Sequence, residues 1–254
     1  MQAKSLEISV DGRSLEAARI AGDPARRPLI LLHEGLGSID LWRDFPRRLH
    51  EACGREIVLF SRFGHGASPA PPRPRSPAFF HEEALHVLPA VLEQVGASEP
   101  LLVGHSDGAS IALVYAANHD VAGISLLAPH VFVEKVTLKA IELTREEFLK
   151  GDLRTRLARR HADPDAAFWG WCGVWLDPAF REWTLDAEAK KLTAPNLLIQ
   201  GVEDPYGSLA QLDRIEALAP CPVQRLHVPG GHNPHLEAAE DTLAAVAAWQ
   251  SELH

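Results

Sequence analysis

One pentapeptide, Gly104-His105-Ser106-Asp107-Gly108, combines a residue type and a spacing that point to chemistry. It follows the apolar run 101–103 and precedes small residues at positions 109, 112 and 116, which predicts a strand, a sharp turn and a helix. Glycines on both sides let the two backbones cross closely and let the turn adopt unusual dihedral angles. Ser106 is therefore expected to stand clear of its neighbours as a nucleophile.

A serine hydroxyl attacks a carbonyl carbon at neutral pH only when a nearby base removes its proton. Imidazole titrates in the right range, and a carboxylate on its second nitrogen fixes the tautomer and stabilises the imidazolium. Of the 13 histidines, His232 is the best candidate base because it lies in a Gly-Gly-His loop just after an apolar run. His227 lies within that run, and His235 begins a helical segment.

Strands and helices that alternate along the chain must position these side chains. Short apolar runs predict buried strands at 29–32, 57–60, 101–103, 124–127, 197–199 and, more weakly, 223–228. Segments of helical period separate most of them, and Pro89 is expected to kink the one that contains Leu85, Leu88 and Val91. This alternation predicts an α/β fold with a mostly parallel sheet, helices on both faces and functional loops at the carboxyl ends of the strands.

The N-terminal part differs from this alternation. The runs 6–10 and 17–20 flank the Asp11-Gly12 turn and predict an antiparallel hairpin.

The interval 134–193 has no buried-strand run and holds four of the six tryptophans. Leu138, Ile141, Phe148 and Leu149 have the spacing of one helix face. A helical insertion between two strands of a parallel sheet is best explained as a cap that excludes water from the strand ends. We therefore expect a core of residues 1–133 and 194–254 with a helical cap at 134–193; the alternative is an ordinary helical excursion with core aromatics.

The chain resembles the α/β-hydrolase superfamily over nearly its whole length. Besides the Ser106 turn, LLHEGLGS at 31–38 resembles the oxyanion loop of the family and SRFGHGAS at 61–68 resembles its glycine-rich turn. Gly201-Val202-Glu203-Asp204 and Gly230-Gly231-His232 follow strands as the acid and the histidine of the family do. The resemblance implies Ser106 as nucleophile, His232 as general base and Asp204 as the acid.

Two other carboxylates stay open as the acid. Glu203 is adjacent to Asp204, and Glu134 follows the run 124–127, where some members of the superfamily carry the acid.

The oxyanion of a tetrahedral intermediate needs fixed hydrogen-bond donors. The backbone N–H groups of Gly35 and Asp107 are the expected donors. The family commonly has glycine directly after the loop histidine, where this chain has Glu34. A carboxylate facing a developing anion is unfavourable, so Glu34 is expected to be turned away or hydrogen-bonded.

The substrate pocket is expected between the strand ends and the cap. Its predicted lining comprises His105, His130, Trp169, Trp171 and Trp175.

Composition and charge narrow the choice of binding partner and cellular compartment. A net charge of −9 and a pI near 5.8 disfavour nucleic acid and anionic membrane surfaces as partners. Three cysteines without framework spacing fit reduced packing residues in a cytoplasmic protein, and no stretch has the length of a signal peptide core or a membrane span. We expect a small-molecule substrate, and the oligomeric state stays open, with a homodimer among the alternatives.

No cofactor and no metal ion are expected. The segment HEEALH at 81–86 is similar to a zinc signature, but its histidines are five residues apart and do not share a helix face. No dinucleotide or Walker loop is present. Arg154, Arg156, Arg159 and Arg160 fit a solvated helix face better than an anion site.

The reaction class follows from the serine and from the resemblance. Dehalogenases and epoxide hydrolases of the family carry aspartate where this chain has Ser106, which leaves acyl transfer to water. Cleavage of a carboxylic ester, as by a carboxylesterase, ranks first. The alternatives are an acyl-CoA thioesterase, a hydrolase of a carbon–carbon bond in a vinylogous diketone, for which Asn233 replaces the usual tryptophan, and a non-catalytic binding protein.

Overall fold

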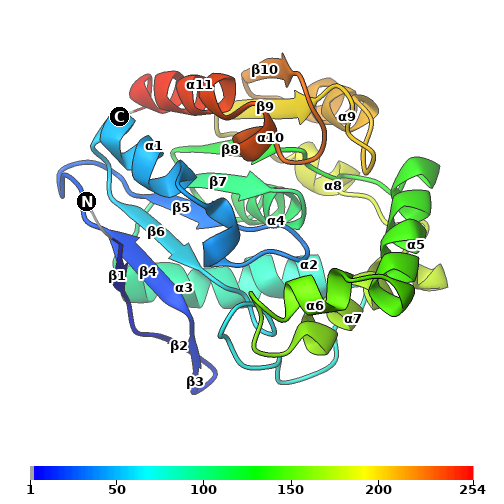
Figure 1. Cartoon of the computed structure of the whole chain (residues 1–254). Coiled ribbons are helices and arrows are strands. Elements are labelled where there is room, and N and C mark those ends of the chain that lie inside the picture. Colours follow the sequence, from blue (N-terminus) through cyan, green and yellow to red (C-terminus); the bar gives the residue numbers. More distant parts are fainter. Residues whose placement is uncertain (1–2, 254) are drawn as a thin grey trace.

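The computed structural model describes residues 3–253, which form an eight-stranded sheet with helices on both faces (Figure 1). The strand order is β1-β4-β6-β5-β7-β8-β9-β10. The strands are β1 (Lys4–Ser5), β4 (Ala17–Ile20), β5 (Leu29–Leu32), β6 (Ile57–Phe60), β7 (Leu101–His105), β8 (Gly123–Leu127), β9 (Asn196–Gly201) and β10 (Val223–Val228). In the sheet, the neighbouring strands β6, β5, β7, β8, β9 and β10 all pair in parallel, which confirms the predicted fold class.

The six predicted strand runs all lie in the parallel part of the sheet. Every residue of β5, β6, β7, β8 and β9 is buried, as expected for strands covered on both faces. Alternate side chains enter different cores: Leu29 and Leu31 pack into one, Ile30 and Leu32 into the other. β10 is at the edge and only partly buried, which explains its weaker apolar pattern.

The predicted N-terminal hairpin has a different second strand. β2 (Ile8–Val10) pairs with β3 (Arg13–Leu15), and Ala17–Ile20 instead joins the main sheet as β4, antiparallel to β6. Asp11 and Gly12 both have positive φ, 52° and 72°, as a two-residue hairpin turn requires. Such a turn pairs Val10 directly with Arg13, so the partner strand is complete before Ala17.

Helices cover both faces of the sheet (Figure 1). On one face α1 (Phe45–Cys53) packs against α11 (Ala239–Ser251). On the other face α4 (Asp107–Ala116) contacts β5, β7 and β8 and also α2 (Phe79–Glu82). Further elements are η1 (Ile39–Trp42), α9 (Ala210–Leu218) and α10 (Pro234–Glu237).

The helical run around Pro89 changes its winding. A π-helical turn, η2 (Glu83–Val87), separates α2 from α3 (Leu88–Val95). Pro89 has no backbone N–H to donate to the preceding turn, and the change of winding directly precedes it. Leu85 is consequently 41% exposed, although its spacing predicted a buried position.

The interval 134–193 is helical, in α5 (Lys135–Lys150), α6 (Leu153–Leu157), α7 (Pro164–Trp175), η3 (Pro178–Phe180) and α8 (Asp186–Ala189). Figure 1 shows α5, α6 and α7 beyond the carboxyl ends of the strands. Phe148 of α5 stacks on Phe168 of α7 with ring centroids 3.8 Å apart, whereas Leu149 is exposed, contrary to its predicted place on the same face. The boundaries of a separate cap stay a prediction.

Within residues 3–253, no helix is both long and apolar enough to cross a bilayer. The three cysteines are free thiols; Cys53 and Cys172 are buried and Cys221 is half-buried. Burial raises the pKa of the Cys172 thiol to about 11. This thiol therefore stays protonated at neutral pH and packs as a small apolar group.

Candidate active site

Ser106 connects β7 to α4 with φ 53° and ψ −118°, a backbone conformation that a residue with a Cβ atom rarely adopts. The two flanking glycines make this turn feasible. A Cβ atom on Gly104 would lie 2.4 Å from the carbonyl oxygen of Gly108, and one on Gly108 would lie 2.0 Å from that of Leu32. The strained turn therefore requires both glycines and holds the Ser106 hydroxyl at the end of the strand.

The structure brings His232 and Asp204 to Ser106 from two other loops. His232 Nε2 lies 2.8 Å from Ser106 Oγ, and His232 Nδ1 lies 2.7 Å from Asp204 Oδ2. Because the carboxylate can only accept, Nδ1 carries the proton and donates it. Nε2 is then free to accept the hydrogen bond from the Ser106 hydroxyl.

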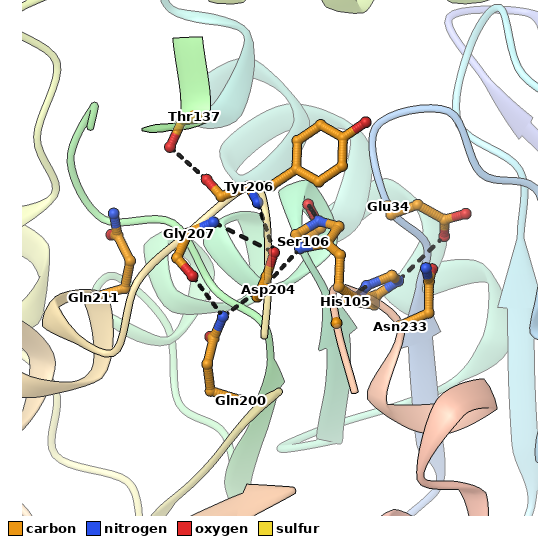
Figure 2. Close-up of polar contacts among 12 residues, drawn as sticks. Glu34, His105, Ser106, Thr137, Gln200, Asp204, Tyr206, Gly207, Gln211 and Asn233 are labelled. Carbon is orange, nitrogen blue, oxygen red and sulfur yellow. Dashed lines mark hydrogen bonds and ion pairs between the residues drawn. The ribbon is translucent and has the colours of Figure 1, made fainter. Parts of the chain in front are cut away.

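Asp204 is the best-supported carboxylate in this group of residues. Its Oδ1 accepts from the amides of Tyr206, at 2.7 Å, and Gly207, at 3.3 Å, and its Oδ2 also accepts from Gln200 Nε2 at 2.6 Å (Figure 2). Burial raises the pKa of Asp204, but the hydrogen bond from His232 and the Tyr206 amide outweigh burial and bring the pKa below its usual value. Asp204 therefore stays ionised opposite His232.

The two alternative acids lie elsewhere. Glu134 accepts from the Ser208 amide at 3.0 Å, the Ser208 hydroxyl at 2.7 Å and Gln211 Nε2 at 2.7 Å. It thereby joins the start of α5 to the loop before α9. Glu203 is exposed. Of the three candidates, only Asp204 contacts the His232 ring.

Glu237, which was not among the residues predicted from the sequence, organises the loop that carries His232. Its carboxylate accepts from the amide of Gly231 at 2.6 Å and from that of Asn233 at 3.0 Å, on either side of His232. Gly230 has φ 97°, which lets the chain reverse above this carboxylate. An acidic residue in the first turn of a short helix was the available signal.

Gly35 and Asp107, the expected donors to an oxyanion, both line the cavity at Ser106. The Trp171 ring lies against Gly35, and a Cβ atom there would be 2.2 Å from Trp171 Cδ1. The Asp107 side chain is fully buried and accepts from Trp175 Nε1 at 3.2 Å. Burial raises the pKa of this carboxyl group, and the guanidinium groups of Arg62 and Arg75 oppose that shift.

Glu34 points toward His105, as Figure 2 shows, with Oε2 3.4 Å from Nδ1. Burial raises the pKa of Glu34, but the contact with His105 outweighs it and holds the pKa at about 2. His105 Nε2 lies 2.6 Å from the carbonyl oxygen of His232. The carboxylate that departs from the family pattern therefore joins the oxyanion loop, through His105, to the His232 loop.

A cavity of about 160 Å³ opens beside Ser106. Three predicted pocket residues line it: His130, Trp171 and Trp175. His105 and Trp169 do not: His105 is fully buried behind Ser106, and Trp169 lies 42% exposed against Phe148 and Phe168. The lining that sequence reasoning missed comprises Leu36, Thr137, Ile141, Tyr206 and Asn233.

The His130 ring lies between two rings of the site. Its centroid is 5.1 Å from that of Trp175 and 5.6 Å from that of His232. Burial, with the nearby His232, lowers the pKa of His130 to about 3. His130 is therefore neutral at physiological pH and offers the cavity wall an imidazole without charge.

Comparison with known proteins identifies the family. Residues 27–181 match the family model described as the alpha/beta hydrolase fold. The chain belongs to this family. The sequence is 30% identical over 128 residues to a proline iminopeptidase of Lactobacillus delbrueckii subsp. lactis, a match that covers 50% of this chain and 44% of that protein. The chain thus spans less than half the length of the curated relatives it matches.

Solved structures of other alpha/beta hydrolases share the fold. The esterase from Exiguobacterium antarcticum superimposes with a TM-score of 0.76 at 19% identity, over 98% of this chain and 99% of that one. The enol-lactonase from Burkholderia xenovorans LB400 gives a TM-score of 0.76 at 16% identity, over 97% and 100%. At such identities the likeness extends to the fold alone.

The cavity of this alpha/beta hydrolase contains no basic side chain from lysine or arginine among residues 3–253. In the same part of the chain, no three His, Cys, Asp or Glu side chains are grouped so that they could hold a metal ion.

Proposed function

We propose that the protein is a serine hydrolase that cleaves a small carboxylic ester through an acyl-enzyme. The observation that carries this proposal is the continuous chain of hydrogen bonds from Ser106 Oγ to His232 Nε2, at 2.8 Å, and from His232 Nδ1 to Asp204, at 2.7 Å. These are the residue types and the order of contacts that activate a serine at neutral pH.

In this mechanism Ser106 Oγ attacks the acyl carbon while its proton moves to His232 Nε2. Asp204 stabilises the imidazolium that forms. When the tetrahedral intermediate collapses, the proton passes to the oxygen of the leaving alcohol and the acyl group stays on Ser106. Water then attacks the carbonyl carbon of the acyl-enzyme and gives a proton to His232 Nε2. When this second tetrahedral intermediate collapses, His232 passes the proton to Ser106 Oγ and the carboxylic acid leaves.

The carbonyl oxygen becomes an anion during both attacks. The amides of Gly35 and Asp107 line the cavity and are the proposed donors to it. The loss of one such donor typically lowers kcat by about 100-fold to 1000-fold. The helices of 134–193, which contribute Ile141 and two tryptophans to the lining, act in this proposal as a cap that excludes water.

The cavity favours a small and uncharged acyl group. Its volume is about 160 Å³, and Leu36, Ile141, Trp171 and Trp175 supply much of its wall. The arginines of α6 and its neighbourhood are engaged at the surface: Arg154 pairs with Asp165, and Arg160 pairs with Asp40. These pairs argue against an arginine site for the phosphates of an acyl-CoA.

One observation favours a second substrate class, the N-terminal residue of a peptide. Glu34 belongs to the lining of a cavity without lysine or arginine among residues 3–253, and its carboxylate suits the ammonium group of an amine. The curated relatives named proline iminopeptidases agree with this alternative. The same nucleophile, base and acid would act on an amide.

A fluorophosphonate probe and a substrate panel test both classes. The panel contains p-nitrophenyl acetate, butyrate and octanoate together with proline p-nitroanilide. We expect the probe to label Ser106, turnover of the acetate or butyrate above that of the octanoate, and at least a roughly 1000-fold loss of turnover in Ser106→Ala.

Ser251→Ala, in which a surface serine on α11 is removed, is the matched control and should retain full activity. An unlabelled Ser106, or a Ser106→Ala variant with undiminished turnover, contradicts the nucleophile assignment. Preferential cleavage of the anilide selects the peptide over the ester.

A further inference from the structure

Three consecutive carbonyl groups of the oxyanion loop, those of residues 34–36, each lie within hydrogen-bond distance of a different histidine ring. All three rings are buried, with at most 4% of the residue exposed. The pairs are Glu34 O with His33 Nδ1 at 2.7 Å, Gly35 O with His65 Nε2 at 2.8 Å, and Leu36 O with His161 Nε2 at 3.0 Å.

For His161 and His33, the contact of the other ring nitrogen determines which nitrogen carries the proton. The Gly66 amide donates to His161 Nδ1 at 3.0 Å, so the proton of His161 must be on Nε2, facing Leu36. In the same way, the Arg62 amide donates to His33 Nε2 at 3.0 Å. The rings of His33 and His161 therefore donate to the loop. His65 has a carbonyl oxygen at each ring nitrogen, Gly35 O at Nε2 and Phe63 O at Nδ1, the latter at 3.0 Å.

Fixing these carbonyl groups also fixes the amides of the loop. In a trans peptide the N–H points opposite to the C=O of the preceding residue. The contact with Glu34 O thus directs the N–H of Gly35, and the contact with Gly35 O directs the N–H of Leu36. These two N–H groups have no hydrogen-bond partner within residues 3–253, and both residues line the cavity with Ser106. The bond from His161 to Leu36 O directs the N–H of Gly37, which donates to Glu34 O at 3.1 Å and so closes the turn that carries the other two amides.

His161 differs from the other two rings because it comes from the helical interval 134–193, between α6 and α7. It is 4% exposed. Its neighbour Ala162 donates its amide to Gly66 O at 2.8 Å, while the Gly66 amide donates to the His161 ring. The segment is thus attached to the glycine-rich turn after β6, and from there the His161 ring reaches Leu36 at the far end of the loop.

We propose that His161 is a positioning residue for catalysis: it holds the oxyanion loop so that the loop amides meet the developing anion. The proposal rests on the proposed acyl-transfer function of Ser106. His161 acts through Leu36 O and does not touch the substrate. The helical segment therefore does more than cover the cavity, because its docked position completes the anchoring of the donors.

Two substitutions separate docking of the segment from positioning of the loop. His161→Asn keeps a carbonyl oxygen near the place of Nδ1 for the Gly66 amide but is too short to donate to Leu36 O. His161→Gln keeps an N–H at the place of Nε2. We expect kcat for p-nitrophenyl butyrate to fall about 10-fold to 100-fold in His161→Asn, with KM changed less than about 3-fold. In His161→Gln, kcat should recover to within about 5-fold of the wild type.

His50→Leu is the matched control. Its ring nitrogen Nδ1 also contacts a backbone carbonyl, that of Arg55 at 2.9 Å, but on α1. Its kcat should stay within about 2-fold of the wild type. A trifluoromethyl ketone, which forms a tetrahedral adduct with the serine, supplies a second readout, and its affinity should fall in His161→Asn by the same factor as kcat/KM.

The outcomes separate this inference from the proposed function. A wild type that neither turns over esters nor reacts with the fluorophosphonate refutes the function. An active wild type whose His161→Asn variant keeps kcat, or loses only KM, refutes the positioning role alone. So does a His161→Gln variant as impaired as His161→Asn. If His161→Asn does not fold, His161→Gln is compared with the wild type instead. A kcat and a ketone affinity near those of the wild type support the positioning role. A 10-fold loss of both overturns it.

Discussion

Replacing Asp204 by asparagine should move the imidazole proton of His232 from Nδ1 to Nε2 while leaving the shape of the site unchanged. Oδ1 of Asp204 accepts from two backbone amides, of Tyr206 and Gly207, so the NH₂ group of an asparagine cannot occupy that position without opposing two donors. It must take the position of Oδ2, 2.7 Å from His232 Nδ1. There it donates to Nδ1, and the imidazole proton moves to Nε2.

This tautomer cannot accept the proton of Ser106. A serine hydrolase with the wrong histidine tautomer loses about 10⁴ in kcat, which corresponds to about 5 kcal/mol of transition-state stabilisation. The substitution also costs a hydrogen bond from Gln200. Its Nε2 donates to both Asp204 Oδ2 and Gly207 O and would then face the NH₂ group of the asparagine. We expect kcat for p-nitrophenyl butyrate to fall by about 10⁴ in Asp204→Asn, with KM nearly unchanged.

The assay is steady-state hydrolysis with fluorophosphonate labelling and a melting curve for each variant. Glu134→Gln is the control, because Glu134 occupies the alternative acid position but contacts Ser208 and Gln211. It should keep kcat within about 3-fold. The reasoning fails if folded Asp204→Asn loses less than 10-fold, or if Glu134→Gln shows the large loss instead.

Three further outcomes follow from the site. Stability to urea should fall as the pH drops from 6.5 toward 3, because the pKa values of His130 and His235 are about 3 and the folded state then holds fewer protons than the unfolded state. Each ring contributes a slope of about 1.4 kcal/mol per pH unit, so His130→Gln should flatten the curve measured between pH 4 and 7. Gly35→Ala should abolish ester turnover, because its Cβ atom would lie 2.2 Å from the Trp171 ring; a fully active variant would show that this ring yields. Glu237→Ala frees the two amides beside His232 and should lower kcat about 10-fold or more, with fluorophosphonate labelling slowed in parallel; equal labelling rates would exclude the role.

The sequence predicted the sheet and the Ser106 turn because their signals are local. Strands covered on both faces must be apolar at every position, so β5 to β9 stand out as short unbroken runs. The Ser106 turn needs glycine on both sides for steric reasons that lie within a few residues of the serine. The positions of His232 and Asp204 follow because parallel strands end at one edge of the sheet.

Other features depend on contacts between distant segments, and the sequence does not reveal them. Trp169 and Trp171 lie two residues apart on α7, so they face different directions, and only Trp171 reaches the cavity. The orientation of α7 decides which of them does so. Tyr206 likewise lines the cavity because its side chain meets Thr144 of α5, 62 residues away, at 2.7 Å.

The buried histidines show why one residue type recurs around the oxyanion loop. A neutral imidazole can accept from a backbone amide on one side and donate to a carbonyl group on the other, across the width of its ring. Lysine and arginine cannot accept, ionised carboxylates cannot donate, and serine is too short to reach both segments. His33 and His161 each make such a pair of bonds.

The same buried imidazoles make the loop sensitive to acid pH. Burial lowers the pKa of His33, His65 and His161, because a charge on any of these rings would lose its water. Protonation of His161 would also place an N–H on Nδ1, opposite the amide of Gly66 that now donates to it. The buried rings that orient the loop amides at neutral pH are therefore costly to protonate in the folded state. Burial of these neutral imidazoles is the physical cause of both the rigidity of the loop and the acid sensitivity of the fold.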